Sequence, residues 1–164
     1  MTKFRGTGTG ILALALLLST QASAQTVTLT ADLSGGEETP AALNTGMFGT
    51  AEVSVDQTNR EMVVTLRVFN APTGTTAGHI HLGSKGTPGP TVLNFPPGLN
   101  GRVGDFAMSF RLGDTPGVFT PRPAIGINNI DDAIEAIVGG NAYVNVHTTA
   151  NPGGEIRGQL IVRK

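Results

Sequence analysis

Alternating apolar and polar residues recur along most of the chain after residue 25. Residues 27–33 read VTLTADL, with an apolar residue at every second position. A period of two is typical of a strand that has one face in a core and the other in water. The same pattern predicts about eight strands. They cover residues 27–33, 51–55, 62–69, 77–82, 91–95, 106–111, 142–148 and 155–162.

Short turn-forming segments between the predicted strands indicate which strands pair as hairpins. Residues 57–60 (QTNR) and 151–154 (NPGG) favour turns, so the strands on either side of each should form antiparallel hairpins. One segment has helical spacing instead, and Asn129 can cap it, which predicts a short helix near residues 130–138. Because no strand–helix unit repeats, we predict an all-β fold, an antiparallel Greek-key-like β-sandwich or barrel.

The N-terminal residues have a different pattern. A basic start is followed by the apolar run ILALALLL at residues 11–18 and by the small residues ASA at 22–24. These features predict a secretory signal peptide over residues 1–24 and an exported chain, periplasmic or secreted, with a single β domain over 25–164. A membrane-spanning helix needs about 20 apolar residues, so no membrane span is expected after cleavage.

Composition narrows the chemistry that the domain can perform. The chain has no cysteine, which excludes disulfides, thiolate metal sites and a cysteine nucleophile. Its net charge is −1, becomes more acidic once the leader is removed, and includes no Lys/Arg cluster. We therefore expect neither nucleic acid nor an anionic membrane as a partner, and an unidentified protein or cell-surface partner instead.

The chain contains three histidines, which are its candidate metal ligands. His79 and His81 are two apart in one predicted strand and so share a face, and His147 lies in a late strand. In both strands they oppose the aliphatic residues, so we expect all three on outward polar faces. If the strands are neighbours, the imidazoles form a surface metal site, for copper or zinc because no thiolate is available. The alternative is exposed histidines bonded to nearby side chains.

Two polar residues of the last predicted strand share the face toward which His147 points. Glu155 and Gln159 are candidates to accept a ring N–H and fix the tautomer of a metal ligand. Cross-strand pairing and turn geometry explain the same residues without a metal. No residue is predicted to be catalytic.

Two regions resemble a known family. The motif HIHLGSKG at residues 79–86, and VNVH at 144–147 running into GGEIRGQL at 153–160, resemble the CHRD domain. This chordin-type domain occurs in animal chordins and in many exported bacterial proteins. The resemblance implies a β-sandwich-like module of extracellular proteins.

A more distant similarity is to the copper–zinc superoxide dismutases, through the His-x-His strand, the glycine-rich loop and the late-strand histidine. It implies that His79, His81 and His147 match three copper ligands. The bridging fourth histidine, the cysteines and the zinc ligands of that family are missing here.

Three functions are consistent with these patterns. We favour an exported, non-catalytic CHRD-domain binding module with a copper or zinc site built from the three histidines. The alternatives are a superoxide-dismutase-like copper redox enzyme and a purely structural or adhesive extracellular domain without metal.

Overall fold

The computed structural model describes residues 26–112 and 116–163, so the predicted leader at residues 1–24 lies outside the described part. Nine strands and one α-helix form there. The strands are β1 (Thr26–Ser34), β2 (Phe48–Asp56), β3 (Glu61–Ala71), β4 (Thr75–Leu82), β5 (Thr91–Asn94), β6 (Gly104–Leu112), β7 (Ala142–Thr148), β8 (Ile156–Gln159) and β9 (Ile161–Val162), and the helix is α1 (Ile130–Val138).

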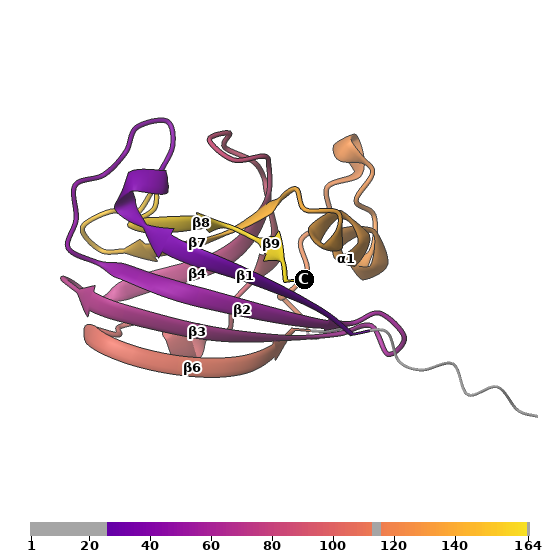
Figure 1. Cartoon of the computed structure of the whole chain (residues 1–164), viewed down its shortest axis with the longest axis horizontal. Coiled ribbons are helices and arrows are strands. Elements are labelled where there is room, and N and C mark those ends of the chain that lie inside the picture. Colours follow the sequence, from indigo (N-terminus) through magenta and orange to yellow (C-terminus); the bar gives the residue numbers. More distant parts are fainter. Residues whose placement is uncertain (1–25, 113–115, 164) are drawn as a thin grey trace, which may run out of the picture.

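The strands form one curled sheet in the order β5-β4-β7-β8-β1-β2-β3-β6, with β9 paired to β1 (Figure 1). Every pair of neighbours is antiparallel. The two ends of the sheet approach each other, since the rings of Phe95, just after β5, and Phe110 on β6 lie 4.8 Å apart. The predicted all-β antiparallel fold is confirmed.

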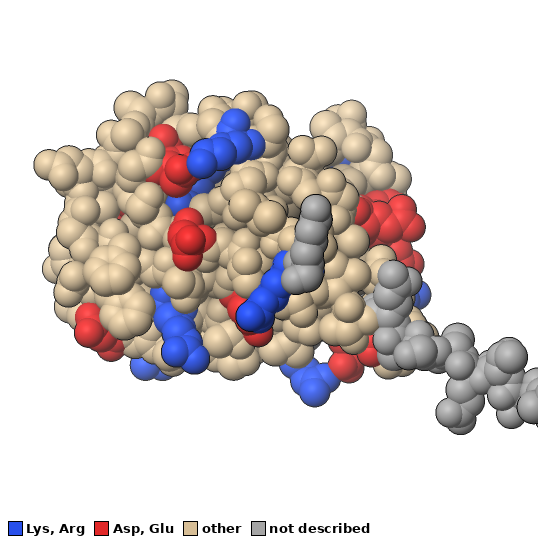
Figure 2. Space-filling model, viewed as in Figure 1, with Lys and Arg blue, Asp and Glu red and all other residues tan. Residues whose placement is uncertain are grey.

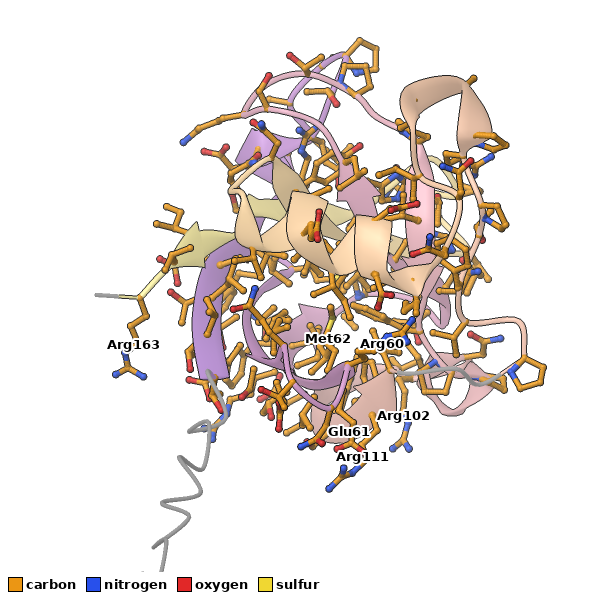
Figure 3. The ribbon with its side chains drawn as sticks, turned by 90° about the vertical axis from the view of Figure 1, so that its right-hand side faces the viewer. Arg60, Glu61, Met62, Arg102, Arg111 and Arg163 are labelled. Atoms are coloured by element: carbon orange, nitrogen blue, oxygen red, sulfur yellow. The ribbon has the colours of Figure 1, made fainter. Side chains whose placement is uncertain are left out.

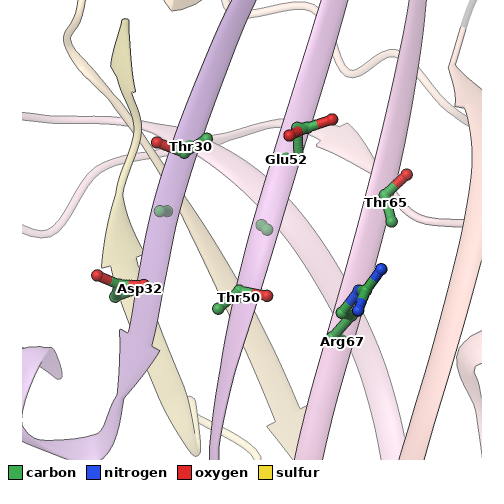
Figure 4. Close-up of a pocket in the computed structure, with 8 residues that line it drawn as sticks. Thr30, Asp32, Thr50, Glu52, Thr65 and Arg67 are labelled. Carbon is green, nitrogen blue, oxygen red and sulfur yellow. The ribbon is translucent and has the colours of Figure 1, made fainter. Parts of the chain in front are cut away.

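Strands β1, β2 and β3 follow the predicted alternation. Their apolar residues are buried in the core, among them Leu29, Val53 and Val64. Their polar residues face outward and line a shallow groove in two rows across the strands (Figure 4). The rows are Thr30, Glu52 and Thr65, and Asp32, Thr50 and Arg67. On the face shown in Figure 2, acidic and basic side chains are interspersed. This half of the sheet therefore has one apolar and one solvent-facing side.

Helix α1 begins as its sequence predicts. The Asn129 side chain accepts hydrogen bonds from the backbone N–H groups of Asp131 and Asp132, and the Asp132 side chain completes the capping box. The apolar face of the helix is buried against the core. Arg60, which lies in the β2–β3 turn and is labelled in Figure 3, forms an ion pair with Asp131 at the start of the helix.

The last predicted strand, residues 155–162, is divided in the structure. Strand β8 pairs with both β7 and β1, whereas β9 pairs with β1 alone, and Leu160 lies between them. Leu160 is buried, but Val162, which the alternation would also place in the core, is 39% exposed. The prediction for Val162 is wrong because β9 no longer pairs with β7 and both of its residues are exposed.

At Gly158, β8 approaches β1 closely. A Cβ added at this residue would lie 2.2 Å from the backbone oxygen of Asp32 and 2.7 Å from Cδ2 of Leu33. No side chain fits there unless the strands separate. The close backbone approach that a glycine inside a strand indicates is therefore present.

We predict that Gly158→Ala destabilises the protein, because its methyl group must displace β1. The expected loss in the free energy of unfolding is about 1–3 kcal/mol, as for other overpacked sites. The matched control is Gly153→Ala in the preceding turn, where an added Cβ would meet nothing within 4 Å. Urea unfolding of the three proteins measures the difference, and equal midpoints for the two variants would contradict the steric explanation.

Candidate metal centre

The pairing of β4 with β7 brings the three histidines together. His79 lies directly opposite Asn145, and Ala77 lies opposite His147, so His79 and His147 are diagonal neighbours. His81 follows on the same face of β4, opposite Tyr143. The two histidine-bearing strands are neighbours, so the condition for a shared site is met.

The imidazole nitrogens converge. Nδ1 of His79 lies 2.9 Å from Nε2 of His147. One nitrogen from each ring can be chosen so that all three lie within 4.8 Å of one another. Two nitrogens that bind one ion from opposite sides at about 2.0–2.1 Å are about 4.1 Å apart, so small side-chain adjustments suffice for a shared ion.

The three histidines point away from the apolar core, as predicted, but the face on which they lie is covered, so the prediction of a surface site is wrong. Every residue of β7 is buried, His147 is 8% exposed, and His79 and His81 are half-buried. The outward face of β7 and β8 is covered by two loops, at residues 35–47 and 83–90. The first loop contacts it through Glu38 and Thr39, and the second through backbone carbonyls.

Backbone carbonyls fix the orientation of two rings. Nδ1 of His81 lies 2.9 Å from the oxygen of Gly89, and Nδ1 of His147 lies 3.0 Å from the oxygen of Pro152. A carbonyl can only accept, so each Nδ1 carries the proton and each Nε2 keeps its lone pair when the ring is neutral. Nε2 of His81 is buried and has no hydrogen-bond partner among the described residues. Such a nitrogen is available to a metal ion.

The predicted supporting role of Glu155 and Gln159 is not what the structure shows. The Glu155 carboxylate accepts hydrogen bonds from Thr45, Thr148 and Asn151. Burial acts to raise the pKa of Glu155, but these three hydrogen bonds outweigh it, and the pKa is lowered. The Gln159 amide donates to the oxygens of Gly83 and Gly140. Neither side chain bonds to an imidazole, because loop carbonyls occupy that role.

Tyr143 and Arg157 support His81, a role that no pattern in the sequence indicates. The rings of His81 and Tyr143 stack with centroids 4.9 Å apart and planes 8° apart. The Arg157 guanidinium carbon lies 3.5 Å from the Tyr143 centroid. The Tyr143 hydroxyl accepts a hydrogen bond from the N–H of Gly89, whose carbonyl binds His81. Tyr143 therefore positions both the face of the His81 ring and its hydrogen-bond acceptor.

The environment favours neutral imidazoles. Burial, followed by the charges of His147 and His81, lowers the pKa of His79 to about 4. Burial also lowers the pKa of His81 and His147, although the Gly89 and Pro152 carbonyls act in the opposite direction. The charges of His147, Arg157 and Arg122 lower the pKa of His81 further. All three rings are therefore uncharged at neutral pH, the state in which imidazole binds metals.

We predict that the metal-free protein loses stability as the pH falls from 6.5 towards 4. The unfolded chain binds a proton at His79 near pH 6.5, whereas the folded chain resists it until about pH 4, so protons favour unfolding in that window. The thermal midpoint, measured by circular dichroism at pH 7 and pH 4.5, should fall less in His79→Gln than in the wild type. Because the carboxylates titrate in both proteins, the difference between the two decreases in thermal midpoint reports on His79. Equal decreases in the wild type and His79→Gln would contradict the lowered pKa of His79.

Comparison with known proteins identifies the family. Residues 29–160 match the model of the CHRD domain. No curated protein and no solved structure matches the chain, so these comparisons give no support to the more distant similarity to copper–zinc superoxide dismutases. Within residues 26–112 and 116–163, no helix is long and apolar enough to cross a membrane. Because the family match extends from β1 to the end of β8, the chain belongs to the CHRD domain family.

Proposed function

We propose that this protein is an exported CHRD-domain binding module that holds one copper or zinc ion between His79, His81 and His147. The function is binding, and no reaction is part of the proposal. The family match supports an extracellular module, and the leader pattern at residues 1–24 supports export to the periplasm or the medium. The partner would be a protein or another component of a cell surface.

One observation carries the metal assignment. Nε2 of His81 is buried and finds no hydrogen-bond donor in the part of the chain that the structure describes, and it belongs to the cluster in which Nδ1 of His79 and Nε2 of His147 lie 2.9 Å apart. An unsatisfied buried polar atom costs about 1–3 kcal/mol. A metal ion that accepts the lone pair of His81 Nε2 would remove that cost, and an ion shared by the three rings would account for the convergence of the three histidines of the chain.

The 2.9 Å between Nδ1 of His79 and Nε2 of His147 is the length of a hydrogen bond between the two rings, and an ion that binds both nitrogens must replace that bond. The separation therefore selects neither metal, and three imidazoles without a thiolate suit both copper and zinc. Binding of Cu(II) requires His79 to release its Nδ1 proton or to carry the proton on Nε2 instead.

The proposal predicts that the purified protein binds Cu(II) and that His81→Ala weakens binding by at least about 100-fold. Loss of an outer-shell partner alone typically reduces metal affinity 10–100-fold, and here a ligand itself is removed. The measurement is calorimetric titration with Cu(II) and, in parallel, with Zn(II). At a free metal concentration of 100 times Kd, binding should also stabilise the fold by about 2.7 kcal/mol.

The matched control is Lys85→Ala. Lys85 lies in the loop that covers the centre but pairs with Glu37, and its side chain is exposed. The Lys85→Ala variant should bind Cu(II) with the same affinity as the wild type. Equal weak binding by the wild type and His81→Ala, with both proteins folded by circular dichroism, would refute the metal site.

A further inference from the structure

Strand β6 forms one end of the sheet, and its outer edge is open. It pairs with β3 on one side only and lies along the lower margin of the molecule in Figure 1. Within residues 26–112 and 116–163, the backbone of Gly104–Leu112 makes no hydrogen bond to backbone outside its ladder with β3. The strand is nine residues long and contains neither proline nor lysine. It therefore lacks the common devices that protect an edge strand from pairing with another chain.

The opposite end of the sheet is protected by the chain itself. Strand β5 has only four residues, and residues 118–120 run along its outer edge. The N–H of Asn94 donates to the oxygen of Val118 over 2.8 Å, and the N–H of Thr120 donates to the oxygen of Val92 over 2.9 Å. Of the two ends of the sheet, β6 is thus the one that has backbone groups available for a further strand.

The apolar side of β6 is also incompletely covered. Its inward side chains, Phe106, Met108 and Phe110, remain partly exposed, whereas the three β3 residues that pair with them are fully buried. Phe110 contacts Phe95 across the gap between the two ends of the sheet, but β5 and β6 are not paired. Apolar surface beside an open strand edge indicates a place where another strand can extend the core.

The sequence of β6 is complementary to itself in the antiparallel direction. If a second copy is placed antiparallel about a two-fold axis at Met108, all nine residues pair. Asp105 then lies opposite Arg111 of the other copy, and Ala107 lies opposite Ser109, all on the solvent-facing side. The next registers that keep the two solvent faces together place Asp105 opposite Ser109 or Arg111 opposite Ala107, and they shorten the ladder. Full overlap and charge pairing therefore select the same register.

Both charged groups are accessible for such a contact. Asp105 is exposed and forms no ion pair within the described residues, and its Oδ1 accepts a hydrogen bond from the N–H of Asn70. The Arg111 side chain is 71% exposed and pairs with Glu61 through one terminal nitrogen, and both residues are labelled in Figure 3. The rest of the Arg111 guanidinium can bind a second carboxylate.

We propose that two copies of this protein associate through antiparallel pairing of β6 with β6, so that the two sheets become continuous. The contact is symmetric, with two Asp105–Arg111 pairs between the copies and the partly exposed aromatic rings of β6 covered on the core side. A single strand ladder makes a small interface, so the dimer is weak and forms reversibly with concentration. The inference is independent of the proposed metal site.

The test is sedimentation velocity of the metal-free protein, with EDTA present, from about 10 µM to about 1 mM. The wild type should show a reversible dimer. Asp105→Arg and Arg111→Asp each place like charges opposite each other twice in the homodimer, so each variant alone should associate at least about tenfold more weakly. An equimolar mixture of the two variants should recover association, because the mixed dimer has two opposite-charge pairs, one native and one reversed.

The matched control is Glu135→Arg, which makes the same change of charge at an exposed position on helix α1 and should dimerise like the wild type. Circular dichroism verifies that every variant is folded. A wild type that stays monomeric at about 1 mM would overturn the proposal. So would single variants that associate like the wild type, a mixture that gains no association, or an equal loss in Glu135→Arg. None of these outcomes bears on the metal site, which calorimetry tests separately.

Discussion

The antiparallel pairing of β4 with β7 is the constraint on which the rest of the candidate site depends. It sets His79 and His147 on diagonal positions of one face, with Nδ1 and Nε2 only 2.9 Å apart. A register shift of one residue would turn every side chain of one strand to the opposite face and would separate the rings. The register is maintained by apolar residues on the other face, such as Ile80 and Val144, which pair with each other and are fully buried. The same pairing therefore positions the core on one side and the imidazoles on the other.

Because two loops cover the polar face of β7 and β8, many polar groups are buried there and need hydrogen-bond partners within the protein. Loop carbonyls supply them to His81, His147 and Arg157, and hydroxyl and amide groups supply them to Glu155. Gly89 illustrates how closely the loop must approach, because a Cβ there would overlap the backbone oxygen of Leu82. The result is a centre with low proton affinity and fixed ring orientation, two properties that suit metal binding.

The sequence predicted those features that depend on local pattern. Alternation in β1, β2 and β3, the Asn129 cap of α1 and the shared face of His79 and His81 all follow from spacing within one segment. The pattern did not show that both faces of β7 are buried, since alternation indicates which residues share a face and not what covers that face. The acceptors for His81 and His147 were also missed, because they are backbone carbonyls and any residue type carries one. The stack of Tyr143 between His81 and Arg157 joins three strands, and no local motif encodes it.

X-ray absorption at the copper edge would show directly whether one ion is bound by three imidazoles. Protein loaded with one equivalent of Cu(II) should show three imidazole scatterers with nitrogen atoms at about 2.0 Å, because His79, His81 and His147 are the only histidines of the chain. His147→Ala should reduce that number to two or fewer. A first shell made of oxygen atoms, with no imidazole scattering in the wild type, would rule out a site built from the three histidines.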